Sequence, residues 1–140
     1  MRDRGSVVLI ENNRVGLIKR TRNGSVYYVF PGGGIEEGEN PEIAAKREAF
    51  EELGVTVNVQ ECLAKVEFKG TQYFFLAEII EGTFGTGQGE EYTDKNRNRG
   101  TYLPIWIDIE NLSYLDVKPK EISYKIQSIF NYTGPFNGIR

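Results

Sequence analysis

Residues 32–55, GGGIEEGENPEIAAKREAFEELGV, place three consecutive glycines ahead of a short acidic stretch with helical periodicity. Asn40 is a suitable N-cap and Gly54 a suitable residue after the last turn, which together predict a helix over residues 41–53. Three carboxylates, spaced at i, i+3 and i+4, share one arc of this helix: Glu48, Glu51 and Glu52. The segment therefore predicts a glycine turn leading into a helix that carries a row of acids.

The apolar residues of this helix occupy the remaining arc and are expected to pack on a sheet: Ile43, Ala45, Ala49, Phe50 and Leu53. The acids are then expected to point away from the core. Like charges this close repel, and Arg47 can reach Glu51 at i+4 to offset part of the repulsion. The carboxylates suit a hard divalent cation such as Mg²⁺ or Mn²⁺, and the glycine turn leaves the carbonyl of Gly33 or Gly34 able to join the metal.

The glycine spacing also suggests an alternative, a loop that cradles phosphate directly. Gly33 and Gly38 have the separation found in such loops, but the next residue is Glu39 where the phosphate loop needs lysine. Direct binding of phosphate by this loop is therefore disfavoured, and binding of phosphate through a metal is favoured.

The rest of the chain predicts a mixed α/β (α+β) fold. Short apolar runs rich in β-branched and aromatic residues predict strands, and spaced isoleucines predict a second helix over residues 119–131. The predicted strands cover residues 6–10, 15–18, 27–30, 55–59, 63–68, 72–80 and 101–109. Between the last two strands, residues 82–100 form a long glycine-rich loop, a kind of segment that is often functional. We expect one domain over residues 1–140, since domains commonly contain about 100 to 150 residues.

Composition excludes several classes of protein. The chain has no histidine, which removes Ser-His-Asp and Cys-His mechanisms and His-ligated metal sites. Its one cysteine, Cys62, cannot form an intrachain disulfide, so a reducing, cytoplasmic location is expected, with the thiol buried. No apolar stretch approaches the roughly 18 residues of a membrane span. The net charge of −3 provides no general attraction for nucleic acid.

The acidic segment resembles a complete Nudix box. Gly33, five residues, Glu39, seven residues, Arg47-Glu48, two residues, Glu51-Glu52, one residue and then Gly54-Val55 occupy every fixed position of this 23-residue pattern. A charged helix face is normally a solvated surface, but this many specified residues at fixed offsets rarely coincide by chance. The resemblance implies an α/β/α sandwich and a hydrolase that cuts the pyrophosphate bond of a nucleoside diphosphate derivative with a divalent metal.

The resemblance also implies roles for individual residues. Glu51 and Glu52 are the first choices as metal ligands, Glu48 is a ligand or the general base, and a Gly33 carbonyl completes the set. Arg47 is expected to orient the glutamates. Glu39 is expected to order the loop or to bind a metal through water. Since some family members place the base downstream of the box, Glu91 in the glycine-rich loop is a second candidate; the alternative is a solvated loop acid.

Substrate contacts are less clearly specified by the sequence. Arg20 or Arg22 could clamp phosphate and Tyr28 could stack on a base, although each is also an ordinary strand or surface residue. The expected partner is a small nucleotide derivative, with no membrane and no stable nucleic-acid complex, and a homodimer is possible. The alternatives are a nucleotide-binding or sensor module without turnover, and an RNA-end pyrophosphohydrolase, which the acidic balance disfavours.

Overall fold

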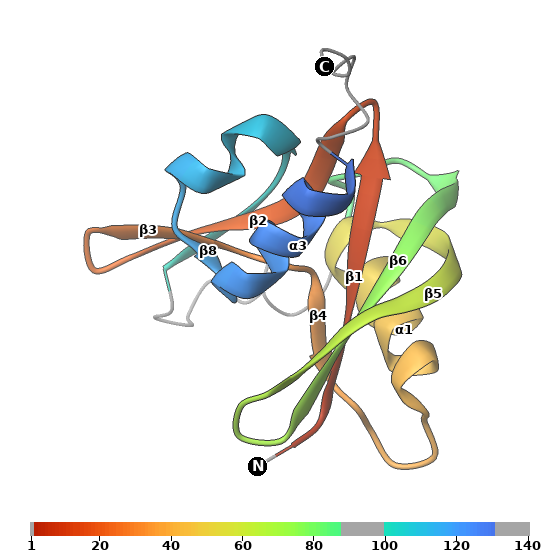
Figure 1. Ribbon diagram of the computed structural model, residues 1–140. Coiled ribbons are helices and arrows are strands. Elements are labelled where there is room, and N and C mark those ends of the chain that lie inside the picture. The colour runs from red at the N-terminus through yellow and green to blue at the C-terminus, as the bar shows by residue number, and fades with distance from the viewer. Residues whose placement is uncertain (1, 88–99, 131–140) are drawn as a thin grey trace.

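The computed structural model describes residues 2–87 and 100–130. A mixed sheet carries a helix on each side (Figure 1). In chain order the elements are β1 (Arg4–Glu11), β2 (Arg14–Arg22), β3 (Ser25–Val29), β4 (Gly32–Gly34), α1 (Pro41–Leu53), β5 (Val55–Glu67), β6 (Thr71–Gly82), β7 (Thr101–Asp108), the 3-10 helix η1 (Ile109–Tyr114), β8 (Val117–Lys118) and α3 (Lys120–Phe130). The expected α/β fold is confirmed.

Strand β1 joins the two halves of the sheet. Its first residues pair antiparallel with β4 and parallel with β6, and its last residues form the hairpin with β2. The order across the sheet is β5-β6-β1-β2-β3-β8, with β7 added on β2 and β4 on β1. One apolar cluster lies under α1 and another lies under α3 and η1. This arrangement brings the N-terminal strand next to the glycine turn.

Helix α1 begins and ends where the sequence predicts. The Asn40 side chain accepts a hydrogen bond from the Ile43 backbone N–H at 2.8 Å, which satisfies one of the free donors of the first turn. Gly54 follows the helix in the left-handed region, at φ 78°, and its N–H donates to the Phe50 carbonyl at 3.0 Å. The predicted helix over residues 41–53 is confirmed.

The predicted orientation of α1 is wrong at two apolar and two acidic positions. Ile43 and Phe50 are 48% and 61% exposed, whereas Glu48 and Glu52 are only 9% and 6% exposed. The reason is the glycine strand β4, which lies against α1 without side chains of its own. The Glu48 carboxylate lies so close to Gly33 that a Cβ there would collide with it. The Glu48 carboxylate therefore fills space that a side chain at position 33 would otherwise occupy.

Two further expectations need correction. The predicted strands 55–59 and 63–68 are parts of a single strand, β5, whose pairing with β6 is interrupted by bulges instead of a turn. Cys62 lies in this strand and is exposed, not buried, because its side chain is on the outer face. The second helix, predicted over residues 119–131, is confirmed as α3.

Candidate active site

Arg47 is the centre of the acidic cluster. Its guanidinium makes a bidentate contact with Glu39, with Nε 2.6 Å from Oε2 and Nη2 3.1 Å from Oε1. Nη1 donates to Glu48 Oε2 at 3.0 Å and to Glu51 Oε1 at 3.2 Å. Nη2 also donates to the Gly34 carbonyl at 3.0 Å, which ties α1 to the glycine turn. Planar guanidinium geometry is what permits one side chain to hold three carboxylates in fixed positions.

These contacts shift two pKa values. The hydrogen bond from Arg47 holds the pKa of Glu39 below its ordinary value, and the backbone N–H of Glu36 adds to this effect. The pKa of Arg47 is raised in turn, mainly by its hydrogen bond to Glu39. Both side chains are therefore ionised at neutral pH. A negative carboxylate and a positive guanidinium hold the loop before α1 against the helix.

Glu52 is positioned from the opposite side of the cluster. Its Oε1 accepts a hydrogen bond from the Gly32 backbone N–H at 2.9 Å, and both groups are buried. Glu48 lies one turn earlier on the same helix, beside Gly33. Glu51 is more exposed, with 46% of its side chain accessible. The cluster thus presents two buried carboxylates and one exposed carboxylate along the edge of the glycine turn.

The candidate ligand atoms of the acidic cluster have the chemistry that a hard divalent cation prefers. It consists of carboxylate and carbonyl oxygens, which Mg²⁺ and Mn²⁺ prefer, and it includes no nitrogen or sulfur ligand. Within residues 2–87 and 100–130, however, no three acidic, histidine or cysteine side chains already converge as a metal cage. The Arg47 guanidinium lies between Glu48 and Glu51 and contacts both. Metal binding at this cluster therefore requires the acids to reorient toward a shared ion.

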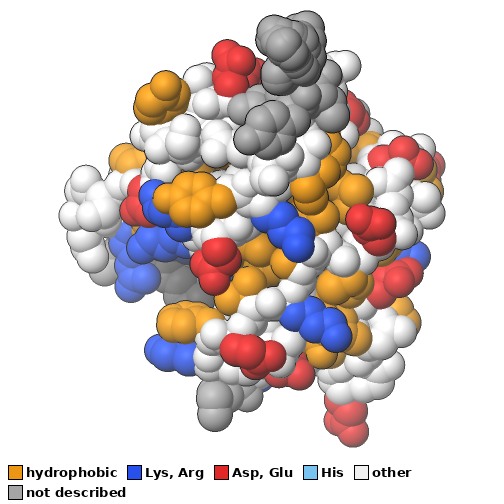
Figure 2. Space-filling model, in the orientation of Figure 1, with side chains coloured by type: hydrophobic (Ala, Val, Ile, Leu, Met, Phe, Trp, Pro, Cys, Tyr) orange, Lys and Arg blue, Asp and Glu red, His pale blue; other side chains and the backbone are white. Residues whose placement is uncertain are grey.

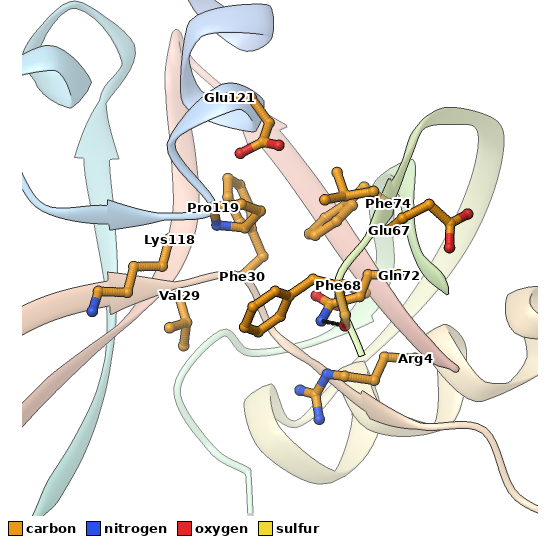
Figure 3. A pocket seen from close by; sticks show the side chains of 12 residues that line it. Arg4, Val29, Phe30, Glu67, Phe68, Gln72, Phe74, Lys118, Pro119 and Glu121 are labelled. Carbon is orange, nitrogen blue, oxygen red and sulfur yellow. Dashed lines mark hydrogen bonds between the residues drawn. The ribbon is translucent and has the colours of Figure 1, made fainter. Parts of the chain in front are cut away.

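A cavity with aromatic walls lies between α3 and the β5–β6 hairpin, and we name it the aromatic groove. Its volume is about 410 Å³, and Phe30, Phe68 and Phe74 form its walls. Phe30 and Phe74 meet edge to face, with ring centroids 5.6 Å apart. Figure 3 shows Arg4 at one end of this groove and Glu121 at the other. Flat ligands with an anionic end suit such a shape and charge pattern.

A second cavity, which we name the basic groove, adjoins the first. It has a volume of about 520 Å³ and shares Arg4, Phe68 and Gln72 with the aromatic groove. Its other lining residues are Arg2, Gly34 and Lys69. Three cations and no acid therefore line this cavity, which reaches the glycine turn at Gly34. Negative phosphate groups are attracted to a surface of this kind.

Comparison with known proteins identifies the family. The model of the NUDIX domain matches residues 1–125, most of the chain. The chain belongs to the Nudix family. The resemblance stated from the box is thereby confirmed, and the enzyme class follows: a Nudix hydrolase that acts on phosphoric anhydride bonds in nucleotide derivatives. Nudix hydrolases generally use divalent metal ions.

Two curated relatives differ in the activity for which they are named. An RNA pyrophosphohydrolase of Pelagibacter ubique is 27% identical over 91% of each chain. An 8-oxo-dGTP diphosphatase of Escherichia coli is 35% identical over 54% of this chain and 64% of its own. Among solved structures, a NUDIX hydrolase from Nitrosomonas europaea has a TM-score of 0.70 at 15% identity, covering 93% of this chain and 88% of its own. The structural likeness supports the Nudix fold.

The structure brings together the predicted residues of the Nudix box but not the predicted substrate contacts. Arg20 stacks on Tyr102, with its guanidinium 3.8 Å from the ring centroid, and it does not line either groove. Arg22 is exposed at the end of β2 and lines neither groove. Tyr28 is 9% exposed and packs in the core, which argues against stacking on a substrate. Glu91 lies outside the described residues.

Sequence reasoning missed the residues that do line the grooves, chiefly Arg2, Arg4, Phe68, Lys69 and Glu121. They come from three separate segments, and no single segment has a recognisable spacing. A usable signal exists for Arg4, the first residue of β1, and for Arg2 two positions before it, since side chains at i and i+2 of an extended chain point the same way. In the described part of the chain, no helix is long and apolar enough to cross a membrane.

Proposed function

We propose that this Nudix hydrolase cuts the pyrophosphate bond of a small nucleotide derivative with Mg²⁺ or Mn²⁺. The observation that supports the proposal is a basic groove that reaches the glycine turn at Gly34 and continues into an aromatic groove. The same turn is held against the acidic helix by the hydrogen bonds of Glu52 and Arg47. A nucleotide has the same order of chemistry, with a phosphate chain attached to a flat base. The phosphates would lie near Arg2 and Arg4, and the base would lie among the phenylalanines.

In this proposal the metal ligands are Glu48, Glu51 and Glu52, with the Gly33 carbonyl. A divalent ion held there would offset the charge of the diphosphate and would polarise a water molecule. Arg47 orients the carboxylates through the contacts described above, and Glu48 or Glu91 accepts the proton of the attacking water. Glu39 holds Arg47 in place.

Arg4 has a specific position in this arrangement. It donates from Nη2 to the Gly32 carbonyl at 3.3 Å, and it lines both grooves. Its guanidinium is therefore held at the junction where the proposed phosphate chain would meet the nucleoside. Binding of phosphate by a fixed arginine reduces the entropy lost when the substrate is oriented.

A second candidate function is removal of pyrophosphate from the 5′ end of RNA. The long match to a protein named RNA pyrophosphohydrolase favours it, and the chemistry at phosphorus is the same. The net charge of −3 disfavours it, because extended RNA binding usually depends on a basic surface. On the face shown in Figure 2, acidic and basic side chains are interspersed. We therefore favour a small substrate.

Three other expectations stay predictions: a single domain over residues 1–140, a cytoplasmic location and a possible homodimer. The alternative of a nucleotide sensor without turnover is not favoured, because the box residues are complete and held in contact with one another by Arg47.

The experiment is a substrate screen with Mg²⁺ and with Mn²⁺. Nucleoside triphosphates, nucleotide sugars, dinucleoside polyphosphates and 5′-triphosphorylated RNA are incubated with the protein, and release of phosphate, pyrophosphate or nucleotide is measured. We expect metal-dependent hydrolysis of at least one free nucleotide, and faster turnover of it than of RNA. Lack of turnover with every substrate, together with tight nucleotide binding in calorimetry, would favour the sensor alternative.

A matched pair of variants tests the site itself. Glu52→Gln keeps an oxygen that can accept the Gly32 hydrogen bond but removes the charge, and we expect at least a tenfold loss of turnover, in line with removal of a metal ligand. Glu42→Gln is the control, because Glu42 lies on the outer side of the same helix and pairs with Lys46. Titration of Mn²⁺ by electron paramagnetic resonance should show weaker binding in Glu52→Gln alone.

A further inference from the structure

The last turn of α1 carries two of the three proposed metal ligands in an electrostatically unfavourable place. Glu51 and Glu52 lie just before Leu53, the last residue of the helix. Free backbone carbonyls make this end of a helix negative, so it disfavours carboxylates and favours basic side chains. The last turn contains no basic residue. Its free carbonyls therefore depend on donors from outside the helix.

The chain supplies these donors from the segment after β6, residues 83–87, which we name the capping segment. The backbone N–H groups of Gly85 and Thr86 both donate to the Leu53 carbonyl, at 2.9 and 3.1 Å. Gly87 approaches the same turn so closely that a Cβ at this position would collide with the helix backbone. The capping segment therefore lies directly against the end of the acidic helix.

Phe84 anchors the capping segment to the sheet. Its ring packs on the apolar cluster under α1 and contacts Trp106 of β7, with ring centroids 4.5 Å apart. The ring also covers Gly16 of β2, where a Cβ would lie 2.9 Å from the ring carbon Cε1. One aromatic side chain thus connects the segment that caps α1 with two strands of the sheet.

Ordering the capping segment costs backbone entropy, which the buried part of the Phe84 ring offsets. Gly85, at φ 97°, and Gly87 lose much conformational freedom when they are fixed. Thr86 stabilises the turn only locally, since its N–H and Oγ1 contact the Thr83 carbonyl at 3.3 and 2.7 Å. Removal of the ring should therefore release the cap and leave every group of the acidic cluster in the chain.

We propose that Phe84 is a positioning residue for the divalent-metal site. Its ring, seated against Gly16 and Trp106, holds the capping segment on the end of α1. The last turn then keeps Glu51 and Glu52 where they can bind the ion. The inference rests on the proposed function, because it takes these two glutamates as metal ligands.

Titration of Mn²⁺, followed by electron paramagnetic resonance, tests this role without a substrate. Phe84→Ala should raise the Kd for Mn²⁺ by about tenfold, in the range found for residues that hold metal ligands in place. Phe84→Leu keeps an apolar side chain against Gly16 and should stay within about threefold of the wild-type Kd. Phe130→Ala is the control and should keep the wild-type Kd, because Phe130 is a half-buried phenylalanine that packs on the other apolar cluster, under α3.

Gly16→Ala tests the same contact from the side of the sheet. Its Cβ would displace the Phe84 ring and leave all the acids unchanged. We expect this variant to weaken Mn²⁺ binding as well. The double variant should bind Mn²⁺ no more weakly than Phe84→Ala alone, because no ring is left to displace. Independent, additive effects of the two substitutions would overturn the proposed contact.

Amide hydrogen exchange shows where the chain loosens, and it needs no bound metal. In Phe84→Ala, exchange should become faster in the capping segment and in the last turn of α1, while the first turn, which Asn40 caps, keeps its wild-type rate. Faster exchange spread evenly over α1 would indicate a general loss of stability and would overturn the positioning role.

The dependence of turnover on Mg²⁺ provides a further check. At saturating Mg²⁺ the kcat of Phe84→Ala should return to within about threefold of wild type, because the ligands themselves are intact. A loss of turnover that is the same at every Mg²⁺ concentration would contradict the inference.

These measurements separate failure of the inference from failure of the proposed function. Equal Kd values for Mn²⁺ in wild type, Phe84→Ala and Phe130→Ala overturn the inference, even where the wild-type protein hydrolyses nucleotides. Weaker Mn²⁺ binding in Phe84→Ala but not in Phe130→Ala supports it. If the wild-type protein then hydrolyses no substrate in the screen, only the proposed function fails.

Discussion

Glu52 and Gly32, twenty positions apart, are joined by a buried hydrogen bond of 2.9 Å from the glycine N–H to the carboxylate. This bond fixes the helix that carries the acids to the strand that precedes it. The Glu52 carboxylate therefore has a structural role in addition to its proposed role as metal ligand. The two roles can be separated by choosing substitutions that keep or remove the acceptor oxygen.

The first prediction uses this separation. Glu52→Ala removes the acceptor and leaves the buried Gly32 N–H unpaired, which should lower the free energy of unfolding by about 1–3 kcal/mol. Glu52→Gln keeps an acceptor and should lose less than half as much stability while losing activity. Urea denaturation followed by circular dichroism measures both. Equal stability of the two variants would show that the hydrogen bond contributes little.

A second prediction concerns the close approach of Gly33 to Glu48. A Cβ at position 33 would collide with the Glu48 carboxylate, so Gly33→Ala should destabilise the protein by about 1–3 kcal/mol and displace a proposed ligand. Because the obstacle is a side chain, the same substitution should cost less stability in a Glu48→Ala background. A double-mutant cycle by urea denaturation measures this coupling. If the stability losses of Gly33→Ala and Glu48→Ala simply add in the double variant, the collision with Glu48 is not the cause of the destabilisation.

The ion pair of Glu39 and Arg47 predicts how stability depends on pH. The pKa of Glu39 lies below its ordinary value of 4.5 because Arg47 and the Glu36 N–H stabilise the carboxylate. The resulting stabilisation is fully present above about pH 4.5 and is lost as the pH falls through the lowered, folded-state pKa. Wild-type protein should therefore lose stability relative to Glu39→Gln in acid.

Urea unfolding of both proteins between about pH 3 and pH 7 measures this difference. Glu42→Gln serves as the control, since its partner Lys46 lies 3.5 Å away in an exposed pair of little energetic value. A stability difference between wild type and Glu39→Gln that stays constant with pH would contradict the assigned cause.

Cys62 provides a prediction about accessibility. Its thiol is exposed on β5 and lines neither groove, so a thiol reagent should label one equivalent in the native protein within minutes. Activity of the labelled protein should stay within about twofold of the unlabelled value, since surface changes away from the site have small effects. Labelling that requires denaturant would show that the thiol is covered.

The two helices were largely predictable because their capping residues and their periodicity can be read from neighbouring positions in the sequence. Asn40 and Gly54 mark the ends of α1 through hydrogen bonds to residues within one turn, and periodicity locates α3. The strand boundaries were less accurate at β5, where bulges continue a strand that the sequence pattern divides into two. A bulge depends on the partner strand, so a single segment contains little sign of it.

By itself, the sequence determined the family, the helix that carries the acids and the role of Arg47 as their neighbour, because all of these follow from residue spacing along one short segment. Only the tertiary structure decided which way the helix faces and which residues line the two grooves. Glu48 is buried because Gly33, on a strand paired with β1, leaves room for its carboxylate, and Glu52 is buried where it accepts the Gly32 N–H. Arg4, Phe68 and Glu121 meet in one groove because β1, the β5–β6 hairpin and α3 pack together. Such proximity arises from packing between distant segments, and no segment encodes it alone.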